Sequence, residues 1–129
     1  LKDISRDPGI WPFFKEVFNR YGWPQCGCSK DDMGFMIDPT DVKRAKYEAA
    51  KEGLELIAVF HLHPCDHRRD QPTDYPSPVD RVLHADQDGV LCVIVHANSE
   101  GFKSFRVFKI SQSKGPLPDV EEVKVCISP

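Results

Sequence analysis

The sequence predicts an α/β fold in which one mixed, curved β-sheet carries flanking helices. In the central part of the chain, apolar runs typical of strands alternate with helix-forming segments, which favours crossovers between parallel strands. Towards the C-terminus such runs follow one another without a helix, which favours hairpins. The 129 residues are typical of one domain, so we expect residues 1–129 to form a single domain.

The first predicted element is a helix over residues 12–21. Its large apolar side chains recur three or four residues apart, on one helical face: Phe14, Val17, Phe18 and Tyr21. Gly22 and Pro24 should end this helix. We expect residues 25–28 to enter a short strand.

The next segments predict a strand, a helix and a second strand. Residues 35–38 form a short apolar run, and residues 39–52 form a helix that Gly53 closes. Residues 54–63 are apolar enough for a buried strand. Residues 64–76 are rich in proline and charge, so we expect an exposed loop.

The second half of the chain begins with a short helix. Ser77 is a cap residue and Pro78 suits the first helical position. Three strands should follow, over residues 90–96, 104–110 and 120–127. Two histidines outside the motifs discussed next are expected at a surface position (His84) and on a strand (His96).

Composition narrows the classes of function. Lys and Arg total 17 and Asp and Glu total 20, a net charge of −3, which argues against a nucleic-acid partner. No apolar run is long enough to cross a membrane, and no signal peptide is evident, so we expect a soluble protein without a membrane partner. Five cysteines, an odd number, favour a reducing compartment such as the cytoplasm.

The sharpest feature is the sequence His61-Leu62-His63-Pro64. Residues two apart on a strand point to the same side, so both imidazoles should project from one face. Paired imidazoles suit Zn²⁺, whose catalytic sites typically have three protein ligands. Asp80, at the start of the helix after the loop, is the candidate for the third ligand.

Simpler interpretations of these residues stay open. The histidine pair could be incidental, and Ser77 with Asp80 has the spacing of a capping box. Cys26 and Cys28 could join the histidines in a structural zinc site, although their spacing is short for one. The loop also carries metal-ligand residue types that we attribute to chance: Cys65, Asp66 and His67.

Taken together, His61-x-His63-Pro64 and Ser77-x-x-Asp80 resemble the signature of the JAB/MPN metallopeptidases. The resemblance covers about residues 35–110 and is strongest to bacterial and phage members. It implies a JAB/MPN, cytidine-deaminase-like fold, zinc held by His61, His63 and Asp80, and a Ser77 that positions water and stabilises an oxyanion. It also implies hydrolysis of a peptide or isopeptide bond in protein substrates, including ubiquitin-like modifiers.

The general-base glutamate of that family has no clear counterpart. Its position aligns with Pro24, or with Gln25 after a one-residue shift, and Asp31 or Asp32 is a second possibility. A glutamine has no basicity near neutral pH, so the alternative is a non-catalytic scaffold or binding module. A weaker local similarity is to phage tail-assembly components.

Overall fold

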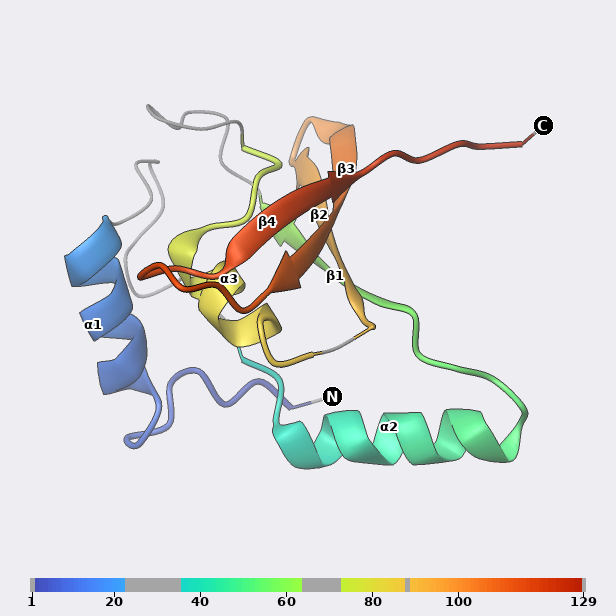
Figure 1. Cartoon of the computed structure of the whole chain (residues 1–129), viewed down its shortest axis with the longest axis horizontal. Helices are drawn as coiled ribbons and strands as arrows, with labels where there is room; N and C mark the ends of the chain where they lie inside the picture. Colours follow the sequence, from blue (N-terminus) through green and yellow to red (C-terminus); the bar gives the residue numbers. More distant parts are fainter. Residues whose placement is uncertain (1, 23–35, 64–72, 88, 129) are drawn as a thin grey trace.

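The computed structural model describes residues 2–22, 36–63, 73–87 and 89–128. Its helices and strands are, in chain order (Figure 1), α1 (Trp11–Tyr21), α2 (Pro39–Lys51), β1 (Ala58–His63), α3 (Pro78–His84), β2 (Leu91–Asn98), β3 (Gly101–Ser111) and β4 (Asp119–Val123). The strand expected over residues 25–28 lies outside the described residues.

The strands form one mixed sheet in the order β1-β2-β3-β4. β1 is parallel to β2, and the connection between them contains α3. β2, β3 and β4 are antiparallel neighbours. The predicted α/β class, with a central crossover and C-terminal hairpins, is therefore confirmed. A register shift at His96 and Ala97 marks a β-bulge, which bends a strand locally.

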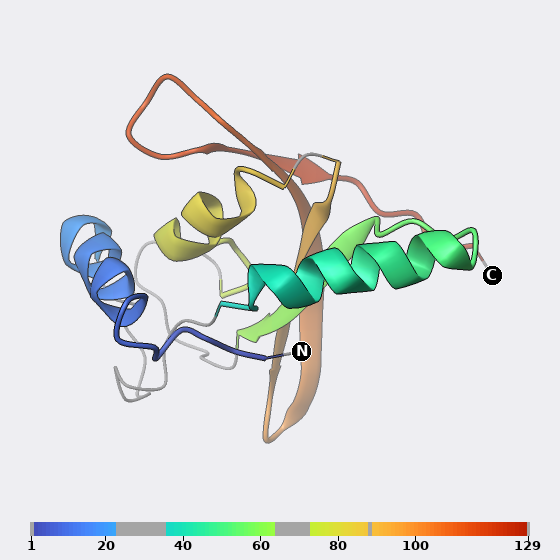
Figure 2. The ribbon, with the colours of Figure 1, turned by 90° about the horizontal axis from the view of Figure 1, so that it is seen from below.

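Helices α1 and α3 lie on one side of the sheet, as Figure 2 shows with the sheet nearly edge-on. One hydrophobic cluster joins the two helices through Phe14, Val17, Phe18 and Val79. A second cluster joins the end of α3 to the sheet and consists of Ala85, Cys92, Ile94, Phe108 and Ile110. These clusters set α3 against the sheet face that carries His61 and His63. Helix α2 has no buried residue.

The prediction of a buried strand over residues 54–63 is wrong in two respects. The strand begins only at Ala58, and it lies at the end of the strand order. Its second face is open in the described structure, with Phe60 73 % and Leu62 57 % exposed. Apolar composition alone could not separate an edge strand from a central one.

Three further expectations are corrected. Residues 36–38 contribute one isolated bridge, between Ile37 and Asp3, rather than a strand. β4 ends at Val123 instead of residue 127. Within the predicted exposed loop, Thr73 and Pro76 are buried, because this stretch runs against the sheet.

Candidate metal centre

Three side chains converge where β1 ends and α3 begins. His61 and His63 are two residues apart on β1, and their Nε2 atoms lie 2.9 Å apart. Asp80 is in the first turn of α3, with Oδ1 3.1 Å from His61 Nε2 and Oδ2 3.3 Å from His63 Nε2. We call His61, His63 and Asp80 the outer set. The structure thus brings together the three predicted metal ligands.

The capping box predicted as an alternative is also present. The Ser77 backbone N–H donates to Asp80 Oδ2 over 2.8 Å, and the Asp80 N–H donates to Ser77 Oγ over 3.2 Å. Asp80 therefore caps the helix and faces the histidines with the same carboxylate. The cap fixes the orientation of the carboxylate, so the two interpretations do not exclude each other.

The Nδ1 atom of His63 has a defined hydrogen-bond partner. Nδ1 lies 2.7 Å from the backbone oxygen of Thr73. A carbonyl oxygen can only accept, so Nδ1 carries a proton and donates it to Thr73. Whenever the ring is neutral, its lone pair is therefore on Nε2, which faces His61 and Asp80. Metal-binding histidines are typically oriented in this way.

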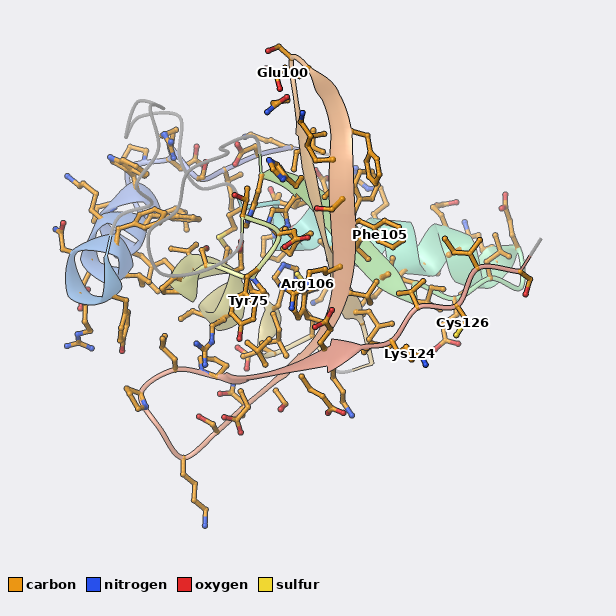
Figure 3. The ribbon with its side chains drawn as sticks, turned by 90° about the horizontal axis from the view of Figure 1, so that it is seen from above. Tyr75, Glu100, Phe105, Arg106, Lys124 and Cys126 are labelled. Atoms are coloured by element: carbon orange, nitrogen blue, oxygen red, sulfur yellow. The ribbon has the colours of Figure 1, made fainter. Side chains whose placement is uncertain are left out.

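The chain next to Thr73 is anchored to the sheet. Asp74 accepts a 2.8 Å hydrogen bond from Ser104 and lies 3.5 Å from the Arg106 guanidinium. Arg106 also forms a 2.7 Å ion pair with Glu122. Figure 3 shows Tyr75 and Arg106 on the same side of β3. These contacts hold the Thr73 carbonyl in place beside His63.

The electrostatics keep Asp80 ionised. Burial opposes its charge, but His61 and His63 more than offset this effect and hold the pKa of the carboxyl well below its usual range. An anionic oxygen ligand beside two imidazoles is a donor set that Zn²⁺ favours.

Two further donors lie beside His61 and were not predicted. His84, expected at the surface, is only 7 % exposed, and its ring stacks on that of His61 with centroids 6.2 Å apart. Cys92 on β2 is 1 % exposed. Potential ligand atoms of His61, His84 and Cys92 all lie within 4.8 Å of one another. We call these three residues the inner set.

The sequence held a signal for only one member of this second group. His84 follows Asp80 by four residues, so the two share a helix face. Cys92 is two residues before Ile94, the register partner of His61, so it shares a sheet face with that histidine. The strand register and the packing of α3 on the sheet, which bring His84 and Cys92 to His61, could not be predicted from the sequence.

The other candidate residues lie outside the described residues. This group includes Gln25, the alternative bases Asp31 and Asp32, the Cys26 and Cys28 pair, and the loop residues Cys65, Asp66 and His67. Among the helices of the described residues, none is long and apolar enough to span a membrane.

Residues 8–108 match the family described as prokaryotic homologs of the JAB domain. The chain belongs to the prokaryotic JAB family. The matched region begins at residue 8, whereas the resemblance expected from the sequence began at about residue 35. Helix α1 therefore falls within the JAB domain. No curated protein and no solved structure matches the chain.

The outer set of this JAB domain suits the zinc ion of the family's peptidases. Two imidazole nitrogens and one carboxylate oxygen already face one another, and Thr73 fixes the tautomer of His63. Three protein ligands leave a fourth position of a tetrahedral ion for water or substrate, which is typical of catalytic zinc.

Proposed function

We propose that this protein is a zinc-dependent peptidase or isopeptidase acting on protein or peptide substrates. The observation that carries the proposal is the convergence of His61, His63 and Asp80 at the start of α3. The family includes peptidases. In addition, the hydrogen bond from His63 Nδ1 to the Thr73 carbonyl leaves Nε2 of that ring available for a metal.

In the proposed hydrolysis, zinc, Ser77 and Gln25 would have different roles. When bound, zinc would supply a Lewis acid that acidifies a water molecule and polarises the scissile carbonyl. Ser77, buried at the helix start, would position that water and donate a hydrogen bond to the oxyanion. Gln25 would orient the water without accepting its proton, which lowers the expected rate.

The substrate class comes from the family resemblance. We infer a peptide or isopeptide bond at the end of a ubiquitin-like or other small protein modifier. The net charge of −3 supports a protein rather than a nucleic-acid partner.

The first experiment measures zinc and hydrolysis together. We expect one zinc per chain by elemental analysis, and slow cleavage of a ubiquitin-like protein fused to a C-terminal peptide. His63→Ala and Asp80→Asn should remove both zinc and cleavage. His96→Gln, which changes the sheet neighbour of His63, is the matched control and should keep both.

The outcomes separate the two functions. A folded protein that binds no zinc would contradict the metal centre. One zinc per chain without cleavage of any fusion tested would favour the non-catalytic scaffold.

A further inference from the structure

The inner set contains a buried polar atom that the rest of the described structure does not use. His84 is 7 % exposed, and its Nδ1 has no hydrogen-bond partner among the described residues. Leaving a buried polar atom unpaired is unfavourable, because the atom has lost its hydrogen bonds to water. Such an atom, placed beside a second imidazole and a thiol, suggests a ligand that the three share.

The three donors come from three different elements. His61 is on β1, His84 is on α3 and Cys92 is on β2. The α3 cap orients the helix, and the cluster that contains Cys92 and Ile94 fixes its end against the sheet. The grouping therefore belongs to the packed core and does not depend on exposed side chains.

We propose that His61, His84 and Cys92 form a second metal site, selective for thiophilic divalent ions such as Cd²⁺ and excess Zn²⁺. Two imidazoles and a thiolate are softer donors than the outer set, which has a carboxylate in place of sulfur. The Cys92 thiol gives its proton to solvent when the sulfur–metal bond forms.

Sharing His61 makes the two sites compete. A neutral imidazole carries a proton on one nitrogen and a lone pair on the other, so it serves one metal at a time. An ion in the inner set removes one of the three outer ligands. This inference adds inhibition by soft metals to the proposed peptidase, although binding at the inner set does not require that activity.

The test uses the sulfur-to-metal charge-transfer absorption of Cd²⁺ in the full chain. The other four cysteines are first changed by Cys26→Ser, Cys28→Ser, Cys65→Ser and Cys126→Ser, so that only Cys92 can give the band. This variant should show the band and bind one Cd²⁺ per chain. Adding Cys92→Ser should abolish the band.

Two further changes in the same background identify the ligands. His84→Ala should weaken Cd²⁺ binding at least about tenfold, because even the loss of a supporting group beside a metal ligand costs that much. His84→Gln replaces it if the alanine variant does not fold, as judged by near-ultraviolet circular dichroism. Asp80→Asn disables the outer set and should keep the band.

The results distinguish this site from the proposed function. A band that survives in Asp80→Asn supports the inner site even if no hydrolysis is ever found. No band in the variant that retains only Cys92, or an unchanged Cd²⁺ affinity in both His84 variants, would overturn the site. Two Cd²⁺ per chain would overturn the competition for His61.

Discussion

At the scale of single residues, two members of the outer set, Asp80 and His63, have backbone partners that orient them. Asp80 is held by the backbone of Ser77, and His63 by the carbonyl of Thr73. These contacts leave one carboxylate oxygen and one imidazole nitrogen directed at His61. Preorganisation of this kind reduces the entropy lost when a ligand binds.

The identity of the base can be tested by substitution at Gln25. Gln25→Glu should raise kcat by about 10²–10⁴-fold, because a carboxylate can accept the proton of water and pass it to the leaving nitrogen. Cleavage of the fusion substrate measures the change. Asp31→Asn and Asp32→Asn are the controls and should have little effect. An active native protein silenced by either aspartate change would place the base in that segment instead.

His84 should make stability depend on pH. Burial, with a smaller contribution from His61, lowers the pKa of His84 from 6.5 despite the opposing effect of Asp80. The unfolded chain therefore takes up a proton before the folded one does, and stability falls as pH drops below about 6.5. One group can contribute at most about 1.4 kcal/mol per pH unit.

Urea unfolding of the metal-free protein between pH 8 and about 5 measures this effect. His84→Gln should lose less stability over that range than the native protein. An identical decline in the two proteins would show that His84 is not responsible.

At the scale of elements, the site depends on residues 73–77, which join the loop to α3. This stretch supplies both the Thr73 carbonyl and the Ser77 cap. Asp74, between them, is held by Ser104 and Arg106 of β3. The sheet thus positions the outer set through a segment that does not belong to that set.

Asp74→Asn should therefore weaken zinc binding. Without the negative charge of Asp74, its contact with Arg106 is weakened and residues 73–77 are held less firmly. Loss of a group that supports a metal ligand typically lowers metal affinity by about 10–100-fold. Competition with a chelator measures the change. Glu122→Gln is the matched control, because it alters the other partner of Arg106 without touching the segment. An equal loss of zinc affinity in the two variants would show that the effect comes from Arg106 and not from the anchoring of residues 73–77.

At the scale of the whole molecule, the hydrophobic clusters form without the outer set. None of their buried members is His61, His63 or Asp80. The helices and the sheet are held by apolar contacts, and the outer set lies where β1 ends and α3 begins.

Removing the metal should accordingly lower the melting temperature without abolishing the transition. A ligand present at 100 times its Kd adds about 2.7 kcal/mol to stability. Calorimetry with and without chelator measures the shift, and Asp80→Asn should show almost none. Complete unfolding in chelator would mean that the metal is structural.

The sequence by itself determined the order of the described helices and of β1 to β4, and it picked out the three residues that meet in the outer set. Strand alternation places His61 and His63 on one face, and the Ser77-x-x-Asp80 spacing places the carboxylate in a first helical turn, because both are local regularities of the backbone. The amphipathic spacing of α1 likewise predicted the burial of Phe14, Val17 and Phe18.

The tertiary structure alone decided what surrounds these residues. Among the described residues, nothing covers Phe60 and Leu62 on the second face of β1, whereas the packing of α3 on the sheet buries His84 beside Cys92. Both outcomes depend on which strands and helices become neighbours. Contacts between distant segments follow from the packing of the whole chain, so no local pattern could specify them.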